Sequence, residues 1–435
     1  MATEATGEKQ AGGDGMAAGQ RFIPVRQSDL VDLLADNGRL PPGDQDAFRP
    51  LADLLDATVH FEFRTRLEAL KDAYAPFRHD PDTRIIHDYD QAQLADARRQ
   101  LVNGLVELLE DANFERIEID EIHQAFEEES LLSVRVEVDF DDLDEVLIYR
   151  RGENVREQQV ESWGGLRKRT VTFTNYEKVL VFVTFKDAAH FGHRETDADA
   201  LPFDPGSTVI KLFQDVPRAD IEMLLPNTEV KMRRVDKFMI GVPAVVSGIV
   251  IAATRLATTV GLILLMVGFW LGFRDEPVEL DQSTLLALGA GLGTLGSYLI
   301  RQFTKYKARQ MEFMKTLSDN LYFRNLDNDA GVFFNLLDAA EEEEVKEALL
   351  GWYFLRTADG PRSREELDQA VEAWFADELG IRFDFEVRDG VGELHRLGLL
   401  EGDDDALTAV AATEALRRLD ARWDQLFEHS SRTSR

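Results

Sequence analysis

The sequence predicts an α+β integral membrane protein, and three observations lead to this fold class. Leucines at helical spacing are followed by segments in which apolar and charged residues alternate, which predicts helices and an antiparallel sheet in one N-terminal soluble domain. Two long apolar segments between residues 238 and 303 predict a transmembrane helical hairpin. The last part of the chain returns to helical spacing and predicts a helical segment followed by a winged-helix-like domain.

The composition is acidic and contains no cysteine. The chain has 435 residues, of which 81 are acidic and 49 basic, and its formal net charge is −32. This composition resembles that of haloarchaeal proteins, in which a dense acidic surface keeps the protein hydrated in concentrated salt. We therefore interpret the charge as halophilic, and we expect no nucleic-acid partner because phosphate contacts need a basic face. The absence of cysteine excludes disulfides and thiolate catalysis.

The N-terminal cytoplasmic domain is predicted to begin after a disordered tail. Residues 1–20 are small and polar and cannot offset the entropy cost of ordering. Residues 21–130 have helical spacing, as in Leu101, Leu105 and Leu108, which lie on one stripe of a helix. We expect residues 21–130 to be the helical part of this domain.

Residues 131–215 are the predicted antiparallel β part of the same domain. Val134, Val136 and Val138 alternate with charged residues, which is typical of a half-buried strand. Residues 179–185 are almost wholly apolar and predict a central strand. Further strands are expected at residues 145–151, 169–175, 178–186 and 207–213.

The lengths of the two apolar segments determine how they are divided. Residues 284–303 cover about 30 Å as a helix, which matches the hydrocarbon core of a bilayer. The first segment is longer than one span, and Pro243 with nearby glycines predicts a break in it. The predicted order is a juxtamembrane connector at 216–237, a re-entrant or interfacial segment at 238–254, a first transmembrane helix at about 256–273, a loop at 274–283 and a second transmembrane helix at about 284–303.

Basic residues on both sides of the hairpin predict its orientation. Positive residues stay on the cytoplasmic side, so we expect a multi-pass protein of the cell membrane with both termini cytoplasmic. The basic residues that predict this topology are Lys231, Arg233, Arg234, Lys237, Arg301, Lys305, Lys307 and Arg309. Arg255 is the only charge in the first apolar segment. We interpret it as a rim charge that reaches water, and the alternative is a functional membrane charge in a pore or an oligomer contact.

The second apolar segment contains a glycine pattern that can be interpreted in two ways. Residues 291–296 match the dinucleotide-binding pattern GxGxxG, but they lack the preceding strand that this site needs, so we reject a cofactor site. Gly289, Gly293 and Ser297 are spaced by four and form a small-residue groove for helix packing. The packing partner is either the first helix or another copy of the chain.

Residues 304–358 are predicted to form a cytoplasmic helical segment. Asp327, Asp329 and Gly331 resemble part of a calcium loop, but the glycine is displaced and an oxygen ligand is missing, so we interpret them as a turn before a helix. We interpret residues 341–344, four glutamates, as the solvated start of that helix. The alternative is that these glutamates dock onto the basic stretch beside the hairpin.

Residues 361–430 are predicted to form the winged-helix-like domain. Ser363 and Glu366 fit a capping box that starts its first helix. A second helix ends at Gly398, and a turn, a strand and a final helix follow. Acidic residues outnumber basic ones here, so contact with a protein is favoured over DNA binding.

Four longer motifs carry a resemblance to a known family. They are Leu212-Phe-Gln-Asp-Val-Pro-Arg-Ala-Asp-Ile-Glu-Met-Leu-Leu-Pro-Asn227, Lys237-Phe-Met-Ile-Gly-Val-Pro243, Asp319-Asn-Leu-Tyr-Phe-Arg-Asn-Leu-Asp-Asn-Asp329 and Asp338-Ala-Ala-Glu-Glu-Glu-Glu344. With them the chain resembles, over roughly residues 21–430, a family of uncharacterised two-pass membrane proteins that includes an animal mitochondrial transmembrane protein and plant organellar relatives. The resemblance implies a membrane location and a domain of unknown function. It implies no catalytic residue and no cofactor.

We predict no catalytic, cofactor or metal site from the sequence. His190 and His193 form the only local histidine cluster, and it lacks the HExxH spacing of a zinc helix. The GxxxxGK[ST] phosphate loop is absent as well. Enzymatic activity is left open, and these observations weigh against it.

The leading hypothesis is a membrane-anchored scaffold or protein-interaction module of unknown biochemical function. Its expected partners are membrane lipid and an unidentified cytoplasmic protein. The first alternative is a subunit of a homo-oligomeric pore or transporter, which requires a homo-oligomer because two helices cannot enclose a pathway. The second, less favoured alternative is a membrane-tethered enzyme acting on lipid.

Overall fold

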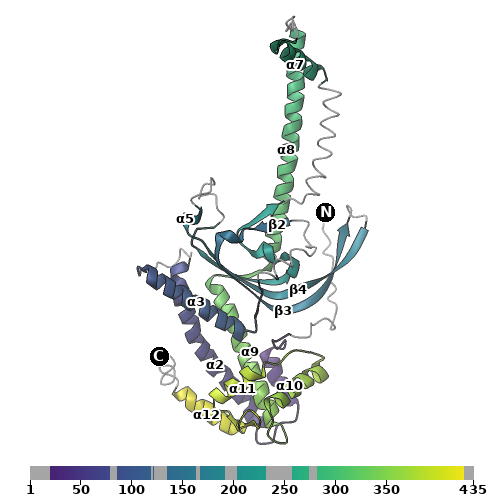
Figure 1. Ribbon diagram of the computed structural model, residues 1–435. Helices are drawn as coiled ribbons and strands as arrows, with labels where there is room; N and C mark the ends of the chain where they lie inside the picture. The colour runs from purple at the N-terminus through teal and green to yellow at the C-terminus, as the bar shows by residue number, and fades with distance from the viewer. Residues whose placement is uncertain are drawn as a thin grey trace. The chain divides into compact units, whose positions relative to one another are not determined.

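The computed structural model describes residues 20–78, 86–118, 121, 135–162, 167–191, 203–231, 257–273 and 282–425 (Figure 1). The chain divides into two compact units. Unit 1 comprises residues 1–129, 139–226 and 324–435, and unit 2 comprises residues 130–138 and 227–323.

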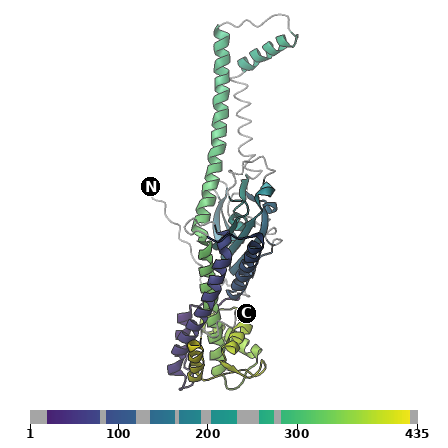
Figure 2. The same cartoon turned by 90° about the vertical axis from the view of Figure 1, so that its left-hand side faces the viewer.

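Unit 1 contains helices that pack against an antiparallel sheet (Figures 1 and 2). Its α-helices are α1 (Gln27–Asp36), α2 (Gln45–Tyr74), α3 (Gln91–Asp111), α5 (Ala188–Phe191), α9 (Ala330–Arg356), α10 (Arg364–Leu379), α11 (Val387–Arg396) and α12 (Ala412–Asp424). Its short 3-10 helices are η1 (Ala75–Phe77), η2 (Phe140–Asp142) and η4 (Arg218–Leu224). The leucine stripe predicted on the third helix is confirmed, because Leu101, Leu105 and Leu108 of α3 are all buried.

The five strands of the sheet in unit 1 are all antiparallel to their neighbours. Their order is β1 (Glu115–Arg116), β3 (Leu143–Ser162), β4 (Arg167–Phe185), β5 (Thr208–Pro217) and β7 (Asn325–Asn328). β4 is central, as its apolar sequence predicts, and Val179, Leu180 and Phe182 have no exposed surface. The two strands predicted at residues 169–175 and 178–186 are one continuous strand.

α9 is the helix around which unit 1 packs. It contacts α2, α3, α10, α11 and β5. Trp352 of α9 stacks on Phe48 of α2 with ring centroids 5.8 Å apart, and its Nε1 donates to the Val410 carbonyl at 3.1 Å. Phe333 meets Tyr74 edge to face with a centroid distance of 5.5 Å. Segments from both ends of the chain are therefore joined through one helix.

The C-terminal part of unit 1 has the predicted order of elements. α10 and α11 are followed by a hairpin of β8 (Leu400–Glu401) and β9 (Thr408–Ala409), and then by α12. The capping box is confirmed, since Glu366 N donates to Ser363 Oγ at 3.2 Å and Ser363 N donates to Glu366 Oε2 at 2.9 Å. α10 ends at Gly380, whose φ of +67° is a conformation that glycine adopts without a steric cost.

Unit 2 contains a two-stranded sheet and two helices. β2 (Arg135–Val138) pairs antiparallel with β6 (Thr228–Lys231), with Val136 opposite Val230. This confirms the strand predicted from the alternating valines. The helices are α7 (Ala257–Trp270) and α8 (Gln282–Arg324).

The structure contradicts the predicted transmembrane hairpin. Among the helices that the structure describes, none is both long enough and apolar enough to cross a bilayer. α7 has 14 residues and covers only about 21 Å, less than the roughly 30 Å of hydrocarbon. α8 has 43 residues, and its apolar first part is followed by Arg301, Lys305 and Lys307. The prediction of an integral, multi-pass protein of the cell membrane with cytoplasmic termini is therefore wrong.

Several predicted features lie outside the described residues. These are residues 1–19 of the disordered tail predicted at 1–20, the re-entrant or interfacial segment 238–254, the charge at Arg255, and three of the basic topology residues, Arg233, Arg234 and Lys237. Most of the predicted loop, residues 274–281, also lies outside them.

The contact between α9 and α11 yields a test of the packing. A Cβ on Gly390 would lie 2.8 Å from the Glu347 backbone oxygen, whereas a Cβ on Gly392 would meet nothing within 4 Å. We expect Gly390→Ala to lower the free energy of unfolding by about 1–3 kcal/mol, because α11 must move away from α9. Gly392→Ala, the matched control, should raise it by roughly 0.5–1 kcal/mol through helix propensity. Urea denaturation measures both, and equal stabilities would contradict this packing.

Candidate functional site

The four glutamates at residues 341–344 lie within α9 and face several parts of unit 1. α9 begins at Ala330, so the prediction that this run starts a helix is wrong. Glu343 is fully buried, so the interpretation of the run as a solvated helix face is also wrong for that residue. Glu341 Oε2 lies 2.9 Å from His60 Nδ1, and Glu342 Oε1 accepts from Gln27 N at 3.1 Å. Glu342 Oε1 also lies 3.7 Å from Lys346 Nζ, an ion pair that the i, i+4 spacing favours.

Glu343 lies at the centre of a buried ion network. Its Oε1 accepts from Lys346 Nζ at 2.7 Å and from Arg151 Nη2 at 2.9 Å, and its Oε2 accepts from Ile23 N at 2.8 Å. Lys346 is 2% exposed, and its Nζ also donates to the carbonyl oxygens of Ile23 at 2.8 Å and Val25 at 3.3 Å. Because these polar groups bond one another, the network suits a structural role rather than catalysis.

A second charged group joins α9 to α11, α2 and α12. Glu393 Oε2 accepts from Arg396 Nε at 2.6 Å, and Arg396 and Arg422 both pair with Glu62, the latter at 3.0 Å. Burial, followed by the nearby charge of Glu393, raises the pKa of Glu344 to about 8. Burial also raises the pKa of Glu393, and Arg396 opposes this rise. Glu344 therefore holds a proton at neutral pH, next to Glu393 and Arg396.

The turn between β7 and α9 contains the residues that were compared with a calcium loop. Asp327 Oδ2 accepts from Asn335 Nδ2 at 2.6 Å, and Asp327 Oδ1 accepts from Asn328 N at 2.8 Å. Asp329 precedes α9 with a φ of +51°, and its Oδ1 accepts from the Tyr74 hydroxyl at 2.9 Å. These carboxylates bond protein donors, which agrees with the interpretation as a turn.

The histidine cluster was predicted not to bind metal, and only half of it is described. His190 Nε2 lies 3.3 Å from Asp142 Oδ1, while His193 lies outside the described residues. Within the described residues, no group of three or more histidines and carboxylates is placed to hold a metal ion.

The small-residue positions of α8 are open in the structure. Gly289, Gly293 and Ser297 are exposed. A Cβ built on Gly289 or Gly293 would meet nothing within 4 Å. Large apolar side chains of unit 2 are exposed as well, and they are Leu264, Leu265, Val267, Phe269, Trp270, Leu271, Phe273, Leu285, Leu286, Ile300, Phe303, Met311, Met314, Tyr322 and Phe323.

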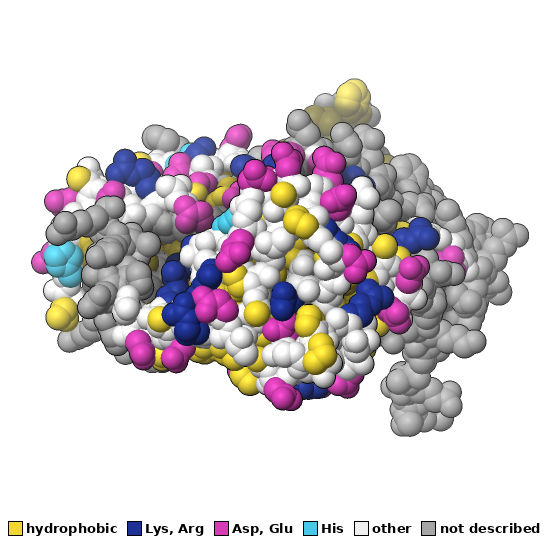
Figure 3. Space-filling model, turned by 90° about the horizontal axis from the view of Figure 1, so that it is seen from below, with side chains coloured by type: hydrophobic (Ala, Val, Ile, Leu, Met, Phe, Trp, Pro, Cys, Tyr) yellow, Lys and Arg dark blue, Asp and Glu magenta, His cyan; other side chains and the backbone are white. Residues whose placement is uncertain are grey.

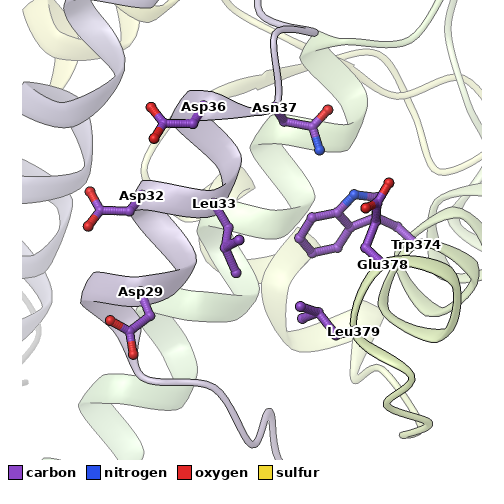
Figure 4. Close-up of a pocket in the computed structure, with 8 residues that line it drawn as sticks. All are labelled: Asp29, Asp32, Leu33, Asp36, Asn37, Trp374, Glu378 and Leu379. Atoms are coloured by element: carbon purple, nitrogen blue, oxygen red, sulfur yellow. The ribbon is translucent and has the colours of Figure 1, made fainter.

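A groove of about 400 Å³ lies between α1 and α10 of unit 1 (Figure 4). Leu33 of α1 and the Trp374 and Leu379 side chains of α10 face one another across it. Its other lining residues are Asp29, Asp32, Asp36, Asn37 and Glu378. The sequence places Trp374 on the buried stripe of its helix, but it does not indicate that α1, more than 300 positions earlier, lies opposite.

Residues 176–331 match the model of a family described as a protein of unknown function (DUF3754). The match begins in β4 and ends in the first turn of α9. It confirms the resemblance to a domain of unknown function, and it carries no information on animal mitochondrial, plant organellar or haloarchaeal relatives. No solved structure matches the chain.

The buried network predicts a large effect for one substitution. Glu343→Gln removes the charge that Lys346 and Arg151 share, so Arg151 loses its carboxylate partner and Lys346 keeps only the longer pair with Glu342, at 3.7 Å. We expect the free energy of unfolding to fall by about 3–5 kcal/mol. Glu342→Gln is the control and should change it by less than about 1 kcal/mol, because the Glu342 side chain is 40% exposed. Equal losses in urea denaturation would exclude a special role for Glu343.

The raised pKa of Glu344 predicts how stability depends on pH. Its folded pKa of about 8 exceeds its ordinary value of 4.5, so its stabilising effect is full below pH 4.5 and is lost as pH rises through 8. Ionised Glu344 would face Glu393 and Asp111, with Arg396 as the opposing charge. We expect Glu344→Gln to reduce the loss of stability between pH 5 and pH 9 by up to about 5 kcal/mol.

Thermal melting of wild type and variant across this pH range measures the effect of Glu344. Glu365→Gln, at an exposed position of α10, is the matched control and should follow the wild-type profile. A Glu344→Gln profile parallel to that of the wild type would show that this carboxyl does not titrate in the range.

Proposed function

We propose that this chain is a protein-interaction module that self-associates through the apolar surface of α7 and α8, with a second copy of the chain as partner. The observation that carries the proposal is the exposure of large apolar side chains in unit 2. Trp270 is 87% exposed, Phe273 84% and Leu286 68%. Apolar surface on this scale is unfavourable in water, and contiguous patches of it mark interaction sites.

The open small-residue positions of α8 support the same role. Gly289, Gly293 and Ser297 recur every four residues and therefore lie along one side of the helix. Small side chains let two helices approach closely, because the distance between helix axes depends on the side chains at the contact. Two copies of α8 present the same surface to each other, which is what two-fold association requires.

The charged clusters of unit 1 support an interaction role over a catalytic one. The carboxylate of Glu343 and the ammonium of Lys346 bond protein groups within the core. Such groups hold elements together and are not presented to a substrate. The exposed side chains of α7 and α8 can contact another protein, whereas these buried charges cannot.

Self-association is tested by substituting one small residue of α8. Gly293→Leu places a large side chain where the close approach is proposed, and we expect it to weaken association at least tenfold, roughly 1.4 kcal/mol. Gly392→Leu, at an exposed position of α11, is the matched control, because a Cβ there also meets nothing within 4 Å. Sedimentation equilibrium of the full chain over a concentration series measures both variants.

Results of two kinds would overturn the proposal, one from sedimentation and one from flotation. The first is a wild-type chain that stays monomeric over the whole concentration series, or an association that Gly293→Leu leaves unchanged. The second is recovery of the chain on lipid vesicles in a flotation assay with no self-association, which would mean that the apolar side chains are covered by something other than protein.

A further inference from the structure

Unit 1 carries a second surface whose chemistry differs from that of α7 and α8. We propose that the groove between α1 and α10 binds a segment of a partner protein that carries basic and aliphatic side chains. This site is separate from the self-association proposed above, and either can hold without the other.

The first observation is an indole N–H that has no acceptor. Trp374 is 5% exposed, and its Nε1 has no hydrogen-bond partner within the described part of the chain. Figure 4 shows the indole between the two helices, with its nitrogen on the side of Asn37 and Glu378. A buried donor without an acceptor is unfavourable, and a backbone carbonyl oxygen that entered between these two side chains would satisfy it.

The second observation is the charge on both sides of the groove. Asp29, Asp32 and Asp36 follow one another along α1, and Glu378 lies on α10 (Figure 4). Arg49 of α2 pairs with Asp32 and, at 3.5 Å, with Asp36. Among the described cations, none forms an ion pair with Asp29 or Glu378. Negative charge is therefore left on each helix for a ligand.

The third observation is the apolar surface between these carboxylates. Leu33 is 39% exposed, and Leu379 faces it from α10 (Figure 4). The methylene stem of a lysine or an arginine packs on such a surface while its charged head stays with the carboxylates. A peptide offers all three groups at once, namely a stem, a positive charge and a carbonyl oxygen. This set fits a peptide segment better than a small cation, which lacks the acceptor.

General attraction of basic peptides must be separated from binding in the groove. The net charge of −32 attracts any cation, and Figure 3 shows acidic and basic side chains interspersed over one face of the molecule. The test therefore compares substitutions inside the groove with one outside it that removes the same charge. Glu378→Gln and Glu365→Gln form such a pair, because both residues are exposed and both lie on α10.

The experiment measures binding of a short labelled peptide of alternating arginine and leucine to the full chain by fluorescence polarisation. We expect Glu378→Gln and Asp29→Asn each to weaken binding about fivefold, since each removes a charged hydrogen-bond acceptor. Trp374→Phe should weaken it by a similar factor, because it keeps an aromatic side chain and removes the N–H. Glu365→Gln should bind as the wild type does, and a peptide with glutamate in place of arginine should not bind.

The outcomes separate the groove from its alternatives. If Glu365→Gln weakens binding as much as Glu378→Gln, the peptide follows the overall charge and the proposal fails. Wild-type affinity in both Glu378→Gln and Asp29→Asn also overturns it, and these exposed positions do not put folding at risk. Thermal melting of Trp374→Phe establishes that it is folded before its affinity is compared.

Discussion

The burial of Glu343 and Lys346 in the middle of α9 is the constraint on which unit 1 depends. Two opposite charges with 0% and 2% exposure are tolerable only when their hydrogen-bonding groups are satisfied. Glu343 meets this condition through Arg151 of β3 and the Ile23 backbone, so two distant segments must converge on one helix. Arg151 and Ile23 are both far from α9 in the sequence, so the network forms only when the chain is folded. The fold in turn buries these charges only because the network satisfies them.

The same constraint distinguishes carboxylates that hold the fold together from surfaces that can bind a partner. Burial raises the pKa of Glu344 to about 8 and also raises the pKa of Glu347, and both residues lie on α9. Perturbed carboxyls often mark active sites, yet here each lies among helices that it joins. Two surfaces remain for partners. One is formed by the exposed apolar side chains of unit 2, and the other is the α1–α10 groove, which contains an indole N–H without an acceptor.

Much of the fold was predictable because it follows from local sequence. The apolar run at residues 179–185 predicts a central strand wherever its neighbours come from, and the capping box at Ser363 needs only residues within four positions. The hairpin prediction failed because crossing a bilayer is not decided by a local sequence pattern alone. It took apolar length along the chain as the decisive quantity, whereas no helix among the described residues is both long enough and apolar enough to cross a bilayer.

The sequence by itself determined the α+β class, the strand and helix periods and the cap of α10, because each depends on side chains a few positions apart. Only the tertiary structure decided that Glu343 is buried, that α1 faces α10 and that Trp374 lacks an acceptor. The Ile23 amide that bonds Glu343 and the α1 residues that lie opposite Trp374 are each more than 300 positions away along the chain. From the sequence alone, Glu343 and Lys346 are expected to form a solvated pair on a helix surface. In the structure Arg151 of β3 and the backbone at Ile23 bond this pair, and it is buried.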